Sequence, residues 1–353
     1  MTCVRRCSFL LLLCCLAGLL PGPVAQAAEP GVLRVLAWPG YADPDVVRGF
    51  EQRHKVRVEV TLIDSDAALW QRMSASGGKD FDVFAVNTAE LQRYIDGALA
   101  QPVDPAAIPN ISRQLPRFRQ VEAIPGLVRG GQVYGVPYTY AEMGLIYDRS
   151  QFVLPPDSIQ ALWDPGLRGR VLAYNGGVHN FSLAMLSLGS EQPFRIGAEQ
   201  WRSTVERLIE LRRNVLGFYA QPEDSVDLFR RHRVALMLAN YGTQQLRLLR
   251  AAGADVGYVI PREGALAWLD CWVVASGARD RQLVEAWLNY MLEPEVSGLL
   301  VSRQSLGSTI AESAENRPQD HLRWLEAVED VGRRERLWVR VISGDRLARV
   351  LAP

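Results

Sequence analysis

An acidic residue inside an apolar run is the strongest chemical signal in this 353-residue chain. Asp270 follows Trp268 and Leu269 and precedes Cys271, so a carboxylate stands among side chains that favour burial. A buried acid needs a partner, which is either a ligand amine or an arginine in a structural ion pair. Because Trp268 also offers an aromatic face, and such faces attract cations, the pattern favours a ligand amine.

Aromatic and polar side chains also follow the ends of the strands expected near the N-terminus. The β-prone run 33–37 leads into Trp38 and Tyr41, and a Pro-Gly turn lies between these two aromatics. Strands that alternate with helices predict a mainly parallel sheet with both faces covered. In such sheets ligands bind beyond the carboxyl ends of the strands. Three ends are expected to converge in this way, at 38–41, 63–66 and 86–88.

A second set of β-prone runs predicts a second lobe. The pair 133–138 and 145–147 is expected to carry the chain into it, and 267–274 to return the chain to the first lobe. Within the second lobe, strands are expected at 170–174 and 234–238. The predicted fold is therefore α/β with two lobes and a cleft at the hinge between them. The expected units are a signal peptide at 1–27, lobe 1 at 28–137 and 265–310, lobe 2 at 138–264, and a C-terminal helical segment at 311–353 that packs across the lobes.

The N-terminal segment has the layout of a secretory signal peptide. Arg5 and Arg6 precede an apolar stretch that continues through Leu20, and small residues occupy alternate positions in the segment 25–27. This layout predicts export and cleavage after residue 27. Lipid attachment at Cys14 or Cys15 is left open. After cleavage Cys271 is the one cysteine that remains, so no intramolecular disulfide can form.

Composition argues against several classes of protein. Lysine plus arginine and aspartate plus glutamate both total 39, and this balance argues against a nucleic-acid partner, which would favour a basic excess. The four histidines are scattered, so neither a zinc site nor another metal or cofactor site is expected. The chain also lacks a G-x-G-x-x-G after a strand, a P-loop and a G-x-S-x-G. We therefore expect a binding protein and not an enzyme.

Landmarks spread along the chain resemble those of type II periplasmic binding proteins of the spermidine/putrescine-binding family. The resemblance covers nearly the whole mature chain, and it implies a periplasmic receptor that captures a small amine and delivers it to an inner-membrane ABC permease. A monomer is expected, and the lobes are expected to close over the ligand. The landmarks are Trp38 and Tyr41, Phe50-Glu51, 81–83, 135–138, 163–165, 169–171, 234–237 and 268–270.

The resemblance implies a partial set of binding residues. Trp268 and Asp270 match the family's aromatic wall and its ammonium-binding aspartate, and Trp38 and Tyr41 match its first-strand aromatics. Asn87 stands where the family has a serine that contacts the amine. The expected ligand-binding residues are Trp38, Tyr41, Asn87, Thr88, Tyr140, Asn175, His179, Tyr241, Trp268 and Asp270.

Several positions depart from the polyamine-binding pattern. Pro39-Gly40 replaces a polar, acidic pair, Ala89 replaces a tyrosine, and Ala239 replaces a tryptophan. The loop 175–179 lacks both of the acids that polyamine binders have there. At least two counter-charges are thus missing, which predicts a monoamine, a modified polyamine or a zwitterion. Glu142 would restore one charge if its side chain reached the cleft.

Two other classes of function stay open at this point. One is a receptor of the same fold for an amino-acid derivative, an organic anion or ferric ion, or a binding module that feeds a sensor. Against ferric ion, no adjacent tyrosine pair occurs at the expected place; against an anion, the cleft loops lack arginine. The other is an enzyme on this scaffold, for which His179 with Asp270 is the one titratable pair to test.

Overall fold

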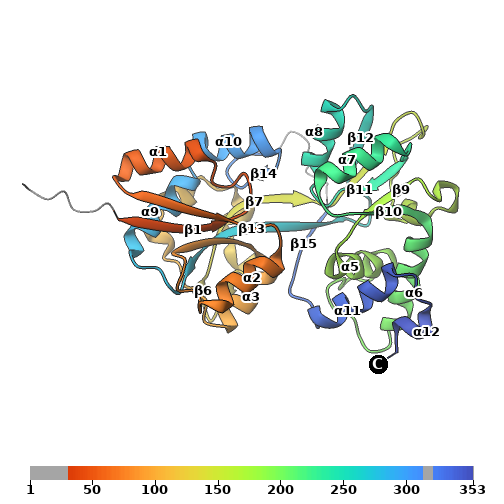
Figure 1. Cartoon of the computed structure of the whole chain (residues 1–353), viewed down its shortest axis with the longest axis horizontal. Helices are drawn as coiled ribbons and strands as arrows, with labels where there is room; N and C mark the ends of the chain where they lie inside the picture. The colour runs from red at the N-terminus through yellow and green to blue at the C-terminus, as the bar shows by residue number, and fades with distance from the viewer. Residues whose placement is uncertain (1–30, 313–320, 353) are drawn as a thin grey trace, which may run out of the picture.

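The computed structural model describes residues 31–312 and 321–352, and it consists of two α/β lobes (Figure 1). The predicted signal peptide lies outside the described residues. Within the described ranges, no helix has the length and apolar character needed to cross a membrane. The red and orange elements on one side of Figure 1 and the green elements on the other correspond to the two sheets.

The sheet of lobe 1 is built around three parallel strands that alternate with helices. Strand β1 pairs with β2 and with β3 in parallel, as the sequence pattern predicted. All three strands end at the same edge, so the segments that follow them converge there. The elements are β1 Val32–Ala37, α1 Pro44–His54, β2 Arg57–Leu62, α2 Asp66–Ala75, β3 Val83–Asn87 and α3 Thr88–Asp96.

Two pairs of strands connect the lobes and make both sheets mixed. β7 (Val136–Glu142) leads into β8 (Leu145–Asp148), and β12 (Val256–Val259) leads back into β13 (Ala265–Ala275). β13 runs antiparallel to both β3 and β7, because it enters lobe 1 from the side of lobe 2. The first sheet has the order β14-β7-β13-β3-β1-β2. The two-lobed α/β fold is confirmed, with parallel strands supplemented by antiparallel crossover strands.

The sheet of lobe 2 has the order β10-β9-β11-β8-β12. Its strands β9, β10 and β11 are parallel, so their carboxyl ends also share one edge. Helices cover this sheet, as in lobe 1 (Figure 1). The elements are β9 Val171–Tyr174, α5 Gly177–Ser187, α6 Trp201–Asn214, β10 Val215–Tyr219, α7 Pro222–Arg231, β11 Leu236–Leu238 and α8 Thr243–Ala251.

The C-terminal part of the chain contacts both lobes. β14 pairs with β7 and β15 pairs with β13, both in the first sheet, whereas α11 packs against α5 and α6 of lobe 2. The expectation of a largely helical end thus missed two short strands, whose few residues carry no periodic signal. The elements are α9 Arg281–Met291, α10 Pro294–Gln304, β14 Gly307–Ser308, β15 Leu322–Trp324, α11 Val331–Ile342 and α12 Leu347–Val350; smaller ones elsewhere are β4 Ala100–Gln101, α4 Pro116–Arg119, β5 Val128–Arg129 and β6 Gln132–Val133.

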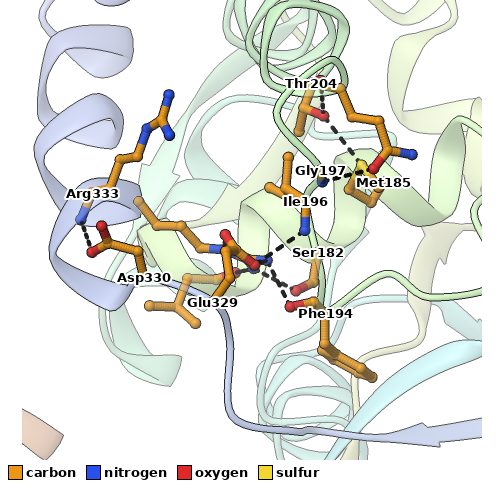
Figure 2. A network of polar contacts seen from close by, with 12 residues as sticks. Ser182, Met185, Phe194, Ile196, Gly197, Thr204, Glu329, Asp330 and Arg333 are labelled. Carbon is orange, nitrogen blue, oxygen red and sulfur yellow. Dashed lines mark hydrogen bonds and ion pairs between the residues drawn. The ribbon is translucent and has the colours of Figure 1, made fainter. Parts of the chain in front are cut away.

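A fully buried arginine attaches α11 to lobe 2. Arg334 pairs with Glu329 through Nε and NH2 at 2.9 and 2.7 Å. Its remaining donors reach the Ser182 hydroxyl at 2.8 Å and the carbonyl oxygens of Val178 and Phe194 at 3.1 and 3.0 Å. Figure 2 shows Glu329 beside Ser182 and Phe194 in this network. Helix α11 near the end of the chain is therefore held against lobe 2.

Candidate ligand-binding cleft

Asp270 lies in β13 at the edge where the strands of lobe 1 end. In register it faces Asn87 of β3 and Thr139 of β7. Asp270 is 6% exposed, and the Tyr41 hydroxyl donates a hydrogen bond of 2.6 Å to its Oδ2. Burial raises the pKa of Asp270 to about 7, and the Tyr41 hydrogen bond opposes that rise. Asp270 is therefore a buried acid with no basic side chain hydrogen-bonded to it among the described residues.

Asp66, the first residue of α2, places a second carboxylate near Asp270. The Asn87 amide donates to its Oδ1 at 3.2 Å, and Ser65 caps the helix by accepting from the Ala68 amide at 3.2 Å. Burial raises the pKa of Asp66 to about 7, and the negative charges of Glu90 and Asp270 add to the rise. The sequence analysis expected segment 63–66 at the site but did not name Asp66 as a binding residue.

Two further acids near the cleft already have partners. Glu90 of α3 pairs with Arg93 at 2.5 Å. Glu335 of α11 is exposed, and it accepts a hydrogen bond of 3.3 Å from the Val178 amide in the first turn of α5. An anion near a helix N-terminus is stabilised by the helix dipole. Burial nevertheless raises the pKa of both Glu90 and Glu335. Asp66 and Asp270 differ from Glu90 in that the described residues place no basic side chain in hydrogen-bond contact with their carboxylates.

Tryptophan side chains flank these carboxylates. Trp38 follows β1, and its Nε1 is buried without a hydrogen-bond partner among the described residues. Trp268 lies two residues before Asp270, on the same face of β13. Its Nε1 donates to the Asn240 carbonyl oxygen at 3.0 Å, which joins lobe 1 to lobe 2. Cations are attracted to such aromatic faces by about 0.5–2 kcal/mol per contact.

The facing wall belongs to lobe 2 and consists of neutral and aromatic side chains. The ring of Tyr174 at the end of β9 stacks with His179 at 5.9 Å and meets Tyr241 edge-on at 6.0 Å. Tyr174 lies close enough to Asp66 for that charge to contribute to the raised pKa of the tyrosine, although burial is the larger cause. Burial also lowers the pKa of His179 to about 4, so this imidazole is neutral at pH 7.

The structure places the expected binding residues in two groups, one in each lobe. Thr88 is fully buried at the start of α3, and its hydroxyl has no partner among the described residues. Asn175 lies in the loop of lobe 2, where its Oδ1 accepts a hydrogen bond of 2.9 Å from Trp338 Nε1. In lobe 1, Asp270 accepts a hydrogen bond from Tyr41 and pairs in register with Asn87, Trp268 shares its strand face, and the Trp38 carbonyl accepts a hydrogen bond from the Tyr41 amide. In lobe 2, His179 and Tyr241 both contact the ring of Tyr174.

Tyr140 lies on the opposite face of the first sheet from Asp270. It pairs with Leu269 in register, and successive strand residues point to opposite faces. Its ring packs against Phe118 and Trp324, and its hydroxyl accepts a hydrogen bond of 3.2 Å from Arg117. The structure therefore does not place Tyr140 with the other expected binding residues. Glu142, two residues further along β7, shares this face, and its charge contributes to the raised pKa of Tyr140.

A separate hollow of about 410 Å³ lies between β15 and a loop of lobe 2. Its lining includes Glu191, Arg195, Arg323 and Trp324 and shares no residue with the cleft at Asp270. The candidate binding site is instead the region around Asp66 and Asp270, because two carboxylates with raised pKa values lie close together there.

Two α/β lobes joined by strand pairs around an acidic and aromatic cleft define a two-lobed solute-binding protein. The chain belongs to the bacterial extracellular solute-binding protein family, whose model matches residues 45–320. Similar sequences include the putrescine-binding periplasmic protein of Escherichia coli K12, 24% identical over 283 residues, with 76% of this chain and 75% of that protein covered. A putrescine/agmatine-binding protein of Pseudomonas aeruginosa is 25% identical over 295 residues, and this match covers 77% of this chain and 76% of that protein.

Solved structures show the same fold. The spermidine/putrescine ABC transporter substrate-binding protein of Streptococcus pneumoniae has a TM-score of 0.73 at 20% identity, covering 90% of this chain and 100% of that one. A periplasmic binding protein of A. tumefaciens in complex with glucopine has a TM-score of 0.64 at 13% identity, covering 91% and 99%. The predicted type II binding-protein fold is therefore confirmed.

Proposed function

We propose that this protein is the periplasmic substrate-binding component of an ABC importer and captures a polyamine or a related small amine by closure of its cleft. The observation that carries this proposal is a pair of carboxylates, the buried Asp270 and the partly buried Asp66, whose pKa values are raised to about 7, chiefly by burial. A ligand ammonium would supply a compensating positive charge. The names of the polyamine-binding relatives support the same class of ligand.

Binding follows from closure of the lobes. An ammonium at the end of β13 would donate charge-assisted hydrogen bonds to Asp270, and these bonds are about twice as strong as neutral ones. The faces of Trp38 and Trp268 would surround the adjoining methylene groups. Lobe 2 would cover the ligand with Tyr174 and Tyr241 and exclude water, which strengthens the electrostatic attraction. The β7-β8 and β12-β13 connections would act as the hinge.

We further propose binding without catalysis, by a secreted monomer that docks on an inner-membrane permease. Asp270 accepts its hydrogen bond from Tyr41, while His179 lies beside Asn240, so the one acid–histidine pair considered for an enzyme is not hydrogen-bonded. The lobe ranges given in the sequence analysis stay a proposal. The alternative ligands are less favoured, because an anion in this cleft would face two acids and one arginine already paired with Glu90.

A thermal-shift screen tests the proposed function. We expect polyamines, monoamines or their derivatives to raise the melting temperature of the mature protein. At a hundred times its dissociation constant, a ligand stabilises the folded state by about 2.7 kcal/mol. Sodium salts of small organic acids serve as the control and are expected to cause no shift. If anions raise the melting temperature and no amine does, the amine proposal is wrong.

Amine affinity is expected to fall as the pH is lowered from 8 to 6. Asp66 and Asp270 must be ionised to pair with an ammonium, and in the ligand-free protein both have a pKa of about 7. The titratable and charged groups around them are Tyr41, Glu90, Arg93, Tyr174 and Glu335. Burial raises the pKa of Glu90 and of Glu335 as well, so protonation of these acids would act in the same direction as that of Asp66 and Asp270. Each carboxylate should contribute roughly a tenfold loss of affinity. Calorimetric titrations at both pH values measure this loss, and an affinity that rises at pH 6 would contradict the assignment.

A further inference from the structure

Helix α8 of lobe 2 is hydrogen-bonded to the C-terminal end of α10 in lobe 1. Gln244 Nε2 donates to Gln304 Oε1 at 3.0 Å. Thr243 Oγ1 donates to the Ser305 carbonyl oxygen at 2.5 Å, and the Arg247 guanidinium donates to the carbonyl oxygen of residue 303. α8 and α10 lie over different lobes on the same side of the molecule (Figure 1). This α8–α10 contact therefore depends on how the two lobes are oriented.

The end of α10 is held to lobe 1 by ion pairs. NH1 of Arg303 pairs with Asp43 at 2.8 Å and NH2 pairs with Asp45 at 2.7 Å, where α1 begins. The last carbonyl groups of a helix have no partner within the helix, so they can accept from another element. The donors here come from α8, and the contact thereby ties lobe 2 to the start of α1.

Gln304 also touches the turn that carries two of the expected binding aromatics. Gly40 in this turn has a φ of 84°, a left-handed conformation that glycine adopts without strain. A Cβ at position 40 would lie 2.6 Å from Cδ of Gln304, so the amide of Gln304 fills the space of a side chain there. Trp38 and Tyr41 flank the turn, and the Tyr41 hydroxyl is bonded to Asp270. Gln304 therefore connects lobe 2 to the turn beside the candidate site.

The α8–α10 contact reaches the side of the crossover strands where the cleft lies. The turn that Gln304 touches follows β1, and β3 separates β1 from the crossover strand β13. A hinge rotation that opens the cleft on this side would carry α8 away from α10. Each hydrogen bond contributes a factor of roughly two to ten to the ratio of closed to open molecules. A larger fraction of the binding-competent closed form means tighter binding of the ligand.

We propose that the α8–α10 contact is a latch that forms as the lobes close, and that Gln304 couples this closure to the turn between Trp38 and Tyr41. Lobe 2 then supports the ligand-binding turn through a residue that does not touch the ligand. The inference rests on the proposed closure of the cleft and is independent of the class of ligand.

The distance between the lobes in the ligand-free protein tests the latch. Spin labels at Arg48→Cys in α1 and Arg230→Cys in α7 report this distance by pulsed electron paramagnetic resonance. Both positions are exposed, whereas Cys271 is buried and stays unlabelled. Because α1 and α7 lie on the same side of the molecule as the contact, opening there lengthens the distance (Figure 1). We expect a mainly short distance in the protein that is otherwise wild type, and a long distance alone would overturn the proposal.

Removal of the three donors of α8 should open the lobes. The triple variant Thr243→Val, Gln244→Ala, Arg247→Ala is expected to raise the ratio of long to short distances about tenfold or more. Gln52→Ala, at an exposed position of α1, is the control and should leave the ratio unchanged. A triple variant with the wild-type distances would show that the contact does not change when the lobes move, and the latch would be wrong.

A double-mutant cycle isolates the role of Gln304. Gln244→Ala and Gln304→Ala should each open the lobes, and the two together should open them no further than either alone, because both remove the same bond. Gly40→Ala should also open the lobes, since its methyl group displaces the Gln304 amide, but it should add nothing in the Gln304→Ala background. Additive effects in either pair would contradict the coupling through Gln304. The glutamine pair decides alone if Gly40→Ala fails to fold.

Discussion

Asp270→Asn is expected to abolish measurable amine binding at pH 8 while the ligand-free protein stays folded. The substitution keeps the shape of the side chain but removes the charge that pairs with the ammonium. Removing one partner of a buried charge pair costs about 2–5 kcal/mol of binding free energy. The dissociation constant is then higher by roughly thirtyfold to several thousandfold. Calorimetric titration of wild type and variant with the same amine measures this loss.

The same substitution should not lower the stability of the ligand-free protein at pH 8. The folded-state pKa of Asp270 is raised to about 7, so folding favours the protonated form. Its stabilising contribution is present at acidic pH and is lost as the pH rises through about 7, where the carboxylate ionises in a buried site. The neutral amide side chain of the variant avoids this penalty. Urea unfolding at pH 8 should therefore give an equal or higher free energy of unfolding.

An exposed acid provides the control for Asp270. Asp255 lies between α8 and β12, its side chain is 74% exposed, and it pairs with Arg149 at 3.3 Å. Asp255→Asn should change neither the affinity nor the stability beyond roughly 0.5 kcal/mol. If Asp270→Asn instead destabilises the protein and leaves the affinity unchanged, Asp270 is a structural residue and the assigned site is wrong.

Arg334→Met is expected to cause the largest loss of stability. Arg334 is 0% exposed, and its guanidinium bonds with Glu329, Ser182 and two backbone carbonyl oxygens. Removing the guanidinium leaves the Ser182 hydroxyl and the two carbonyl oxygens without their donor, at about 1–3 kcal/mol for each buried group, whereas Glu329 reaches solvent and can be hydrated. We expect a fall of this size in the free energy of unfolding, measured with urea.

Arg333→Met is the control for Arg334→Met, because it replaces an exposed arginine next to the buried one. Arg333 is exposed and stacks over the Trp201 ring at 4.0 Å, so Arg333→Met should cost no more than about 1 kcal/mol. The double variant Glu329→Gln, Arg334→Met should lose about as much as Arg334→Met alone, since Glu329 reaches solvent and its charge needs no partner. Equal effects of the Arg333 and Arg334 substitutions would contradict the anchoring role of Arg334.

The sequence was sufficient to predict the architecture because strands and helices leave periodic patterns. The alternation through 33–96 predicted β1 to α3, and the ends at Trp38, Asp66 and Asn87 do converge at one edge. The crossover strands were also anticipated, but their antiparallel pairing was not. Strand direction depends on where the chain enters the sheet, and this is a tertiary property that no local pattern contains.

The site was predictable only where a residue combines an unusual chemical type with a strand end. Asp270 met this condition, since an acid among apolar residues is conspicuous. Asp66 did not, because an acid in the first turn of a helix is ordinary and its role depends on packing near Asp270. Tyr140 was misplaced because one residue of register decides which face of a sheet a side chain occupies.

The charge balance of the cleft also needed the structure. The loop 175–179 has no acid and Pro39-Gly40 replaces a polar, acidic pair, and from such departures the site was expected to lack at least two counter-charges. The structure adds Asp66 on lobe 1, and on lobe 2 it adds Glu335 at the first turn of α5, beside a neutral His179. The number of acids at the site therefore depends on Asp66 and Glu335, two helix residues that no strand-end pattern singles out.

The structure of the protein bound to a small amine tests the central claim most directly. We predict that the ammonium nitrogen lies about 2.7–2.9 Å from a carboxylate oxygen of Asp270, within reach of Asp66, and with its methylene chain between Trp38 and Trp268. An amine bound elsewhere, or one whose nitrogen contacts neither carboxylate, would contradict the account.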